Sequence, residues 1–252
     1  MHTDELHALL RDVQSGRTSP EAAALQLDPT ATADLGFARL DLGRPQRTGE
    51  PEVVWGLNKS AAQVATLMAR IHDAGQVAIA TRIDADKAAE VQAALPEVEW
   101  APMARMLKLV PSGRSSQQVG HIAVVCAGTS DLPVAEEAVE TALAFGSKVT
   151  RHVDIGVAGL QRLLTALPKL RQARVIVAVA GMEGALPTVL AGLVETPVVA
   201  VPTSVGYGSH LGGITPMLGM LTACAPGISV VNIDNGFGAG VVAHRINRLG
   251  AA

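Results

Sequence analysis

Short apolar runs recur through the second half of the chain and alternate with segments of helical periodicity. The runs are rich in Val, Ile and Ala and cover residues 122–126, 149–153, 175–179, 198–201 and 230–233. The helical patterns between them lie near residues 133–145, 158–167, 187–193 and 214–223. Apolar strands separated by helices are typical of a parallel sheet that is covered on both faces. The pattern therefore predicts an α/β fold with a three-layer parallel-sheet domain.

The first half has a less regular pattern, which predicts a smaller α/β unit. Helical periodicity runs through residues 4–26 and is divided by a helix start signal at Ser19-Pro20. The elements expected next are strands at 37–42, 53–56, 77–81 and 103–110, and helices at 60–73 and 84–94. Residues 43–49 are expected to form a basic, turn-rich link, and the polar segment 111–118 to mark a domain boundary. We therefore expect an N-terminal domain, 1–115, and a C-terminal domain, 116–252.

Composition narrows the class of protein. The chain of 252 residues is 48% hydrophobic and 2% aromatic, with a formal net charge of −3 and no long basic run, which argues against nucleic-acid binding. Cys126 and Cys224 form no metal-ligand pair or disulfide framework, which favours the reducing cytoplasm, and Cys126 is expected in the core. We expect no signal peptide, because the N-terminus lacks its basic and apolar regions, and no membrane span, because the apolar runs are short and broken by glycine or proline. No metal-ligand spacing is found among His121, His152, His210 and His244.

Each predicted strand of the second half is followed by a glycine-rich turn. Ligands of parallel sheets bind beyond the carboxyl ends of the strands, and a glycine turn before a helix exposes N–H groups that bind anions. The turn Ala127-Gly-Thr-Ser-Asp-Leu-Pro133 adds small hydroxyls. The turn Ala180-Gly-Met-Glu-Gly-Ala-Leu-Pro187 repeats the arrangement with another carboxylate. Together these turns predict one composite pocket with a phosphate site.

Five motifs, in order, carry a resemblance to a known family. They are the two turns above together with Asp154-Ile-Gly-Val-Ala-Gly159, Val201-Pro-Thr-Ser-Val-Gly-Tyr-Gly208 and Val231-Asn-Ile-Asp-Asn-Gly-Phe-Gly238. The set resembles the C-terminal domain of LarB, the pyridinium-3,5-biscarboxylic acid mononucleotide synthase of nickel-pincer cofactor biosynthesis. That domain is similar to PurE-type aminoimidazole ribonucleotide carboxylase or mutase, so the resemblance implies a PurE-like, flavodoxin-like sheet. Residues 40–47, 51–54 and 81–82 extend it, less distinctively, to the N-terminal half.

The resemblance implies an enzyme that acts on nicotinic acid adenine dinucleotide. Such an enzyme carboxylates carbon 5 of the pyridinium ring and hydrolyses the phosphoanhydride, giving pyridinium-3,5-biscarboxylic acid mononucleotide and AMP. Carbon dioxide or bicarbonate is the expected co-substrate, and Mg²⁺ is the expected ion, with its ligands open and a position near Asp131 considered. A homo-octamer is the expected assembly.

This chemistry assigns roles to four side chains. A pyridinium ring is electron-poor, so a nucleophile must add to it before carbon 5 can attack carbon dioxide, and Cys224 is the candidate for this covalent step. Glu183 is the first candidate for the base that removes the proton from carbon 5, with Asp154 as its partner or substitute. Asp131 is placed beside the phosphate. The alternatives are a buried packing role for Cys224 and turn or helix-capping roles for the three acids.

The remaining candidates are expected to bind the substrate. Glycine N–H groups and small polar side chains suit phosphate and ribose, and guanidinium groups suit the diphosphate or the ring carboxylate. The C-terminal candidates are Gly128, Thr129, Ser130, Gly156, Gly159, Gly181, Met182, Gly184, Thr203, Ser204, Gly206, Tyr207, Gly208, Asn232 and Asn235. The N-terminal candidates are Arg44, Arg47 and Arg82, for which a solvated surface role is the alternative.

Two other functions stay open. A purine-pathway carboxylase or mutase would use the same kind of domain, but PurE-type enzymes carry Ser-Ala-His-Arg after the second strand, where this chain has His152-Val-Asp-Ile-Gly-Val157. A non-catalytic nucleotide-binding module would bind the dinucleotide tightly and form no product.

Overall fold

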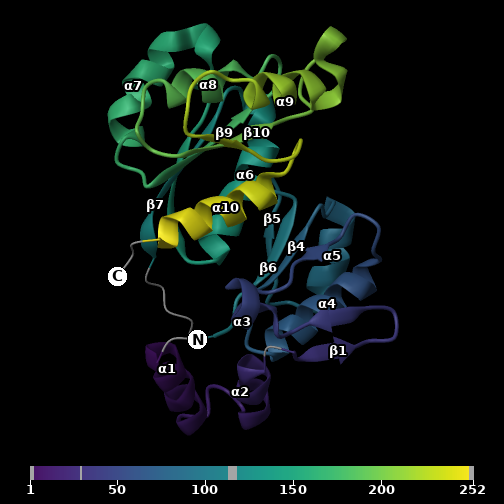
Figure 1. The fold of residues 1–252 in the computed structure, drawn as a ribbon. Coiled ribbons are helices and arrows are strands. Elements are labelled where there is room, and N and C mark those ends of the chain that lie inside the picture. Colours follow the sequence, from purple (N-terminus) through teal and green to yellow (C-terminus); the bar gives the residue numbers. More distant parts are fainter. Residues whose placement is uncertain (1–2, 29, 113–117, 250–252) are drawn as a thin grey trace. The chain divides into compact units, whose positions relative to one another are not determined.

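The computed structural model describes residues 3–28, 30–112 and 118–249 (Figure 1). The chain divides into two compact units, Met1–Ser115 and Ser116–Ala252, and each is described by itself. The expected boundary segment lies largely outside the described residues. Among the residues described, no helix is long and apolar enough to cross a membrane.

The N-terminal unit is a small α/β structure. A mixed sheet of order β3-β4-β6-β5 and an antiparallel pair β1-β2 are combined with five helices in the described part of this unit. The strands are β1 (Thr32–Asp34), β2 (Arg39–Asp41), β3 (Val54–Trp55), β4 (Ala78–Thr81), β5 (Glu99–Ala101) and β6 (Met106–Leu109). The helices are α1 (Thr3–Gln14), α2 (Pro20–Leu27), α3 (Arg44–Thr48), α4 (Ala61–Asp73) and α5 (Ala85–Ala94).

Local signals explain most of these elements. Ser19 and Ser60 cap α2 and α4, as the start signal before Pro20 predicted for α2. The strands β1 and β5 were not expected from the sequence. The prediction of a turn-rich link at residues 43–49 is wrong, because α3 occupies most of it, with Pro45 in the first turn, where its fixed φ favours a helix.

The C-terminal unit is a five-stranded parallel sheet of order β11-β10-β9-β7-β8. Its strands are β7 (Val119–Cys126), β8 (Ser147–His152), β9 (Val175–Ala180), β10 (Val198–Pro202) and β11 (Ile228–Val230). Its helices are α6 (Leu132–Ala144), α7 (Leu160–Leu170), α8 (Ala185–Ala191), α9 (Ile214–Leu221) and α10 (Gly236–Arg248), with 3-10 turns η1 (Thr129–Asp131), η2 (Val157–Gly159) and η3 (Gly208–Gly213). This strand order, with helices on both faces, is that of a flavodoxin-like sheet, as expected.

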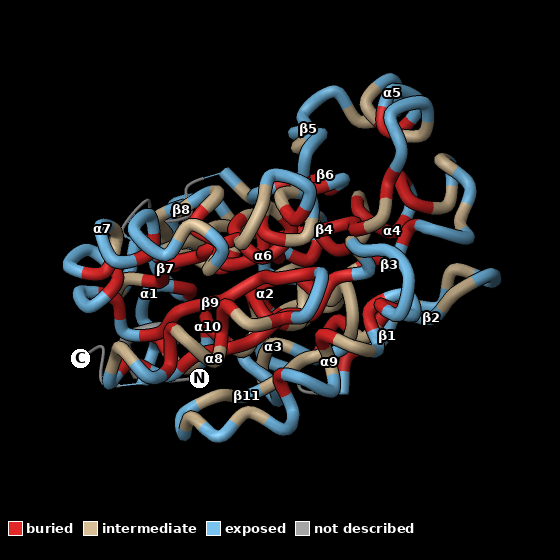
Figure 2. The backbone as a smooth tube through the Cα atoms, turned by 90° about the horizontal axis from the view of Figure 1, so that it is seen from above, coloured by how far each residue is buried: buried red, intermediate tan, exposed pale blue. Residues whose placement is uncertain are grey.

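Both faces of this sheet are buried, and the central strands lie inside the layers of helices (Figure 2). One face packs on side chains of α7, α8 and α9, including Leu163, Leu186 and Met220. The other packs on the alanine-rich faces of α6 and α10, including Ala138 and Ala243. Burial on both faces explains why the strands are continuously apolar rather than alternating.

The last part of the domain differs from the prediction. The final strand spans Ile228–Val230 rather than residues 230–233, and α10 follows where only a glycine-rich turn was expected. A Cβ on Gly236 would lie 2.1 Å from the Val134 carbonyl oxygen, and one on Gly240 would lie 2.7 Å from that of Ala138. These glycines therefore allow α10 to approach the backbone of α6 closely, which is a packing role that their low helix propensity conceals.

Candidate functional site

The five glycine-rich turns follow the carboxyl ends of the five parallel strands, at one edge of the sheet (Figure 1). We call this edge the rim. Hydrogen bonds join its turns: the Gly156 N–H donates to the Ala127 carbonyl over 2.9 Å, and the Met182 N–H donates to the Val205 carbonyl over 2.8 Å. Gly156 and Gly181 lie so close to these neighbouring carbonyls that a Cβ on either would clash with them. The rim is therefore a connected backbone surface.

Asp131 turns inward and holds the rim together. One carboxylate oxygen accepts from the Gly128 N–H over 3.0 Å, and the other accepts from the Thr203 hydroxyl over 2.7 Å. Burial raises the pKa of Asp131 above its ordinary value, and hydrogen bonds from Thr203, Gly128 and Gly181 oppose that rise in part. The side chain makes no capping bond to α6, so its reading as the cap of that helix is wrong. Asp131 links turns that follow three different strands.

Thr129 and Ser130 point the other way. Both are exposed in η1, beside the buried Asp131. Their hydroxyl groups and the N–H groups of this turn are thus available to an anion at the rim.

Asp154 is half-exposed in the turn after β8 and forms an ion pair with Arg162 of α7. Its backbone is left-handed, with φ of 58°. A Cβ on Gly159 would lie 2.6 Å from the Arg162 guanidinium, so the glycine gives that side chain room to reach the carboxylate. As a base, Asp154 would have to give up this partner, which makes it the weaker of the two acids for proton transfer.

Glu183 is exposed at the centre of the rim. It lies between Met182 and Gly184, which have left-handed φ values of 52° and 71°. A Cβ on Gly184 would lie 2.9 Å from Pro216 of α9, so close packing holds the turn. Among the described residues, nothing forms a hydrogen bond or ion pair with the Glu183 carboxylate. Packing thus fixes the backbone of the turn, while the Glu183 carboxylate has no partner within the described part of the chain. A positioned, unpaired carboxylate is suited to act as a general base.

Cys224 is a free, exposed thiol in the segment between α9 and β11. Its reading as a buried packing residue is therefore wrong, whereas Cys126 is 1% exposed in the core, as expected. Burial raises the pKa of the Cys126 thiol and keeps it protonated. A Cβ on Gly219, in α9, would lie 3.0 Å from the Glu183 carbonyl oxygen, so the helix before Cys224 contacts the turn of the proposed base. Cys224 lies in the segment that leads to the start of β11, toward the end of the sheet opposite the rim, so the structure does not bring its thiol together with Glu183 or Asp154.

The turns after β10 and β11 are tied to each other. The Ser204 N–H donates to the Asp234 carboxylate over 2.8 Å, and Asn235 caps α10 by accepting from the Gly238 N–H over 2.8 Å. Asn232 accepts from the Ile233 N–H over 2.8 Å. The asparagines thus shape their turn, while Tyr207 is 81% exposed above the rim. The sequence did not indicate Arg162 as a rim residue, because its partner Asp154 lies in another turn. It also gave His210 no role at the rim.

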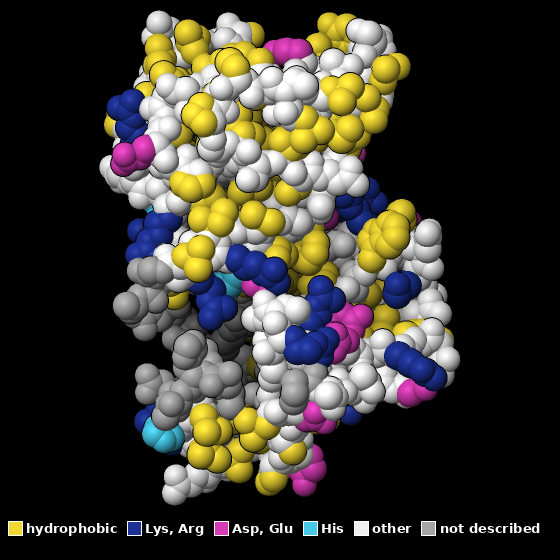
Figure 3. Space-filling view, viewed as in Figure 1, with side chains coloured by type: hydrophobic (Ala, Val, Ile, Leu, Met, Phe, Trp, Pro, Cys, Tyr) yellow, Lys and Arg dark blue, Asp and Glu magenta, His cyan; other side chains and the backbone are white. Residues whose placement is uncertain are grey.

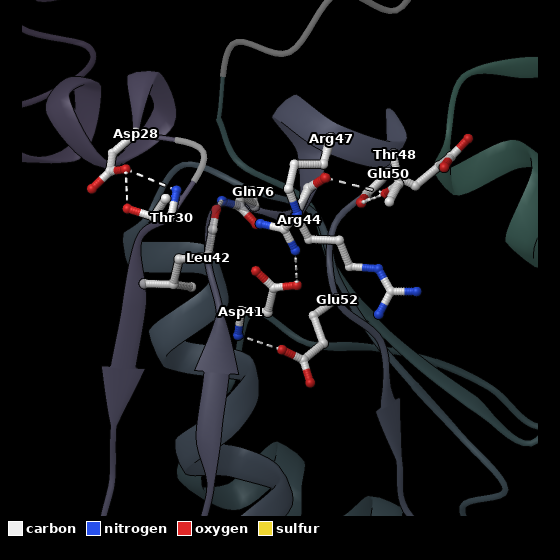
Figure 4. Close-up of polar contacts among 10 residues, drawn as sticks. All are labelled: Asp28, Thr30, Asp41, Leu42, Arg44, Arg47, Thr48, Glu50, Glu52 and Gln76. Atoms are coloured by element: carbon white, nitrogen blue, oxygen red, sulfur yellow. Dashed lines mark hydrogen bonds and ion pairs between the residues drawn. The ribbon is translucent and has the colours of Figure 1, made fainter.

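The three candidate arginines belong to the N-terminal unit. Arg47 is paired with Asp41 over 2.5 Å, and Glu52 accepts from the Asp41 N–H over 2.6 Å (Figure 4). Arg44 lies on the same short helix and is exposed, and Arg82 is half-buried with a left-handed φ of 59°. Because Arg47 is paired with Asp41, we interpret it as a residue that stabilises α3. Of the two arginines on this helix, Arg44 is therefore the better candidate for binding an anion.

The residues around Asp131 do not fit a protein-held magnesium site. Both carboxylate oxygens already accept hydrogen bonds, and the described residues include no group of three or more His, Cys, Asp or Glu side chains that could hold a metal. Mg²⁺ commonly keeps several waters and binds one or two carboxylates together with substrate phosphates. We therefore derive no step through a protein-bound metal ion.

The chain is similar to several known proteins and protein families. Residues 32–111 match the LarB/PurE-like N-terminal domain family, and residues 121–252 match the AIR carboxylase family. An uncharacterized protein of Methanocaldococcus jannaschii is 40% identical over 218 residues, which cover 84% of this chain and 84% of the relative. The N5-carboxyaminoimidazole ribonucleotide mutase of the same organism is 34% identical over 133 residues, covering 51% of this chain and 79% of the relative. A solved structure, Treponema denticola PurE, has a TM-score of 0.45 at 17% identity, over 52% of this chain and 81% of that chain.

Proposed function

The chain belongs to the LarB family, because it joins a LarB/PurE-like N-terminal domain to an AIR carboxylase domain, and we propose that it carboxylates nicotinic acid adenine dinucleotide. The AIR carboxylase match supports a carboxylase-type enzyme. In the proposed reaction, carbon 5 of the pyridinium ring gains a carboxylate and water cleaves the phosphoanhydride. The products are pyridinium-3,5-biscarboxylic acid mononucleotide and AMP.

The carboxylation proceeds through a cysteine adduct. The Cys224 thiolate adds to a ring carbon next to the carboxylated carbon, which neutralises the pyridinium and makes carbon 5 an enamine carbon. Carbon 5 then attacks carbon dioxide, forming the new carbon–carbon bond. Glu183 removes the proton from carbon 5, and expulsion of the thiolate restores the aromatic ring. The net change replaces one ring proton with a carboxylate and leaves the thiolate free.

One observation carries this proposal: the Glu183 carboxylate is exposed at the rim and unpaired within the described part of the chain. The free, exposed thiol of Cys224 supports it. The helix end does not activate the thiol, since carbonyl groups at a helix C-terminus disfavour an anion. Activation is therefore assigned to the substrate, whose positive ring favours the thiolate when it is bound nearby.

The second candidate is a purine-pathway mutase, which the 34% identity to the N5-carboxyaminoimidazole ribonucleotide mutase favours. In the turn after β8, however, the arginine of the PurE-type motif is absent. The turn instead carries Asp154, which forms an ion pair with Arg162 of α7. This turn and the exposed Cys224 favour the pyridine substrate over the purine precursor.

Mass spectrometry of the nucleotide pool separates these functions. We expect the full chain, incubated with nicotinic acid adenine dinucleotide, bicarbonate and Mg²⁺, to release AMP and a mononucleotide heavier by one carboxylate. A parallel reaction with EDTA tests the metal requirement, and ¹³C-labelled bicarbonate identifies the carbon source. Conversion of N5-carboxyaminoimidazole ribonucleotide instead would establish the mutase, and dinucleotide binding without product would establish a binding module.

Self-association is also proposed, with an octamer expected from the family resemblance. The C-terminal unit has an exposed apolar face on α9, formed by Ile214, Leu218 and Leu221, which are 39%, 51% and 60% exposed. Hydrophobic side chains gather over this region in Figure 3. Exposed apolar side chains at helical spacing are typical of a surface that is covered in an assembly.

Substituting this face should reduce the assembly. We expect Leu218→Asp combined with Leu221→Asp to lower the mass measured by light scattering, because two charges replace apolar contact area. The matched control is Leu249→Asp, at a residue that is 77% exposed outside this face, and it should leave the mass unchanged. An unchanged mass in the double variant would show that α9 lies outside the interface.

A further inference from the structure

His210 has no place in the mechanism above, yet its side chain is buried beside the rim. It lies in η3, between β10 and α9, and is only 5% exposed. Its Nδ1 atom accepts a hydrogen bond from the Gly213 N–H over 3.2 Å. A ring nitrogen that accepts from a backbone N–H carries no proton. The neutral ring therefore holds its proton on Nε2, which is a donor.

That donor has no acceptor within the part of the chain that the structure describes. A buried polar group is almost always paired, and an unpaired one is costly. The two ring nitrogens of His210 thus differ in role. Nδ1 fixes the loop through its hydrogen bond from Gly213, and Nε2 can donate a hydrogen bond only to an acceptor outside the described part of the chain.

The residues around Nε2 belong to the turn after β10, which is part of the rim. The imidazole lies against Gly206, where a Cβ would come 2.8 Å from Nε2 and 2.3 Å from Cδ2. Any side chain at position 206 would cover the donor, and Gly206 itself is exposed. The preceding residue, Val205, accepts a hydrogen bond from Met182 N–H, and Met182 is followed by Glu183. The loop that packs on the donor is therefore hydrogen-bonded to the turn that carries Glu183, the proposed base.

We propose that His210 Nε2–H is a positioning group that donates a hydrogen bond to an oxyanion of the bound substrate, either its ring carboxylate or a phosphate oxygen. The inference rests on the proposed function for the identity of the substrate. The hydrogen bond from Gly213 fixes the tautomer and the orientation of the ring, so the acceptor meets a preorganised N–H.

Two substitutions separate this role from a structural one. His210→Asn keeps an acceptor near the position of Nδ1 for Gly213 and removes the donor, whereas His210→Gln places an amide N–H near the position of Nε2 and removes the acceptor. We expect His210→Asn to raise the Kd for the dinucleotide about 10- to 100-fold, the value of one hydrogen bond to a charged acceptor. His210→Gln should stay within about threefold of the unsubstituted protein. Thermal melting of both variants checks that each is folded.

Calorimetric titration without bicarbonate gives the decisive comparison. The ligands are nicotinic acid adenine dinucleotide, nicotinamide adenine dinucleotide, nicotinate and inorganic phosphate. Weakening in His210→Asn that is confined to the nicotinic acid ligands assigns the acceptor to the ring carboxylate, and weakening that includes phosphate and the amide dinucleotide assigns it to a phosphate. Unchanged affinity in His210→Asn, equal losses in both variants, or a larger loss in His210→Gln would overturn the inference.

Failure of this inference is distinct from failure of the proposed function. If the unsubstituted protein forms the carboxylated product and His210→Asn has an unchanged KM, the function stands and the role of His210 falls. If the protein forms no product but the two variants still divide in their affinity for these oxyanions, the function falls and the role of His210 stands.

Discussion

Cys224→Ala is expected to abolish carboxylation, with a loss of at least ~10⁴-fold in rate, the order found when an enzyme loses its covalent nucleophile. Without the thiolate the pyridinium ring stays electron-poor, and carbon 5 has no electron pair to offer carbon dioxide. Affinity for the dinucleotide should change little, because the side chain is exposed and makes no structural hydrogen bond among the described residues. Single-turnover mass spectrometry of the nucleotide measures the loss.

The other cysteine provides the matched control. Cys126→Ala removes a thiol from the core, where the residue is 1% exposed, so it should lower the melting temperature slightly and leave turnover in place. The unsubstituted protein should also show a mass increase of one nucleotide substrate when the reaction is quenched early, and Cys224→Ala should not. Product formation by Cys224→Ala at a normal rate would remove the covalent step from the mechanism.

Glu183→Gln is expected to lower kcat by about 10²- to 10⁴-fold, the usual contribution of a positioned general base. The amide keeps the size of the side chain but cannot take the proton from carbon 5. The turn should keep its shape, because it is held by Gly184 against Pro216 and by the Met182 N–H bond, neither of which uses the glutamate side chain. KM should therefore move much less than kcat.

Glu195→Gln is the control for this substitution. Glu195 is exposed just before β10, at the end of the sheet opposite the rim, and its neutralisation removes the same charge without touching the rim. Substrate deuterated at carbon 5 adds a direct test, since a larger isotope effect in Glu183→Gln than in the unsubstituted protein would show slower proton removal. A kcat unchanged by Glu183→Gln would transfer the base role to Asp154 or another group.

The sequence was most informative where a local pattern decides the structure. Strands β7 and β9 and helices α4 and α5 are buried runs or capped periodic segments, and they lie where the pattern placed them. The pattern failed at α3 and α10. Glycines at 236, 238 and 240 favour a turn by propensity, but α10 forms because Gly236 and Gly240 allow contact with α6.

The order of strands and glycine turns determined where the site lies, because the carboxyl ends of parallel strands must meet at one edge of the sheet. The sequence alone therefore placed the acids of the rim and the phosphate-binding turn. Only the tertiary structure decided which of these groups are free to react. Asp131 is buried among three turns, Asp154 is paired with Arg162, and Glu183 is left exposed. The reason is that burial and pairing come from partners such as Thr203, which are distant along the chain and are brought close only when the sheet is assembled.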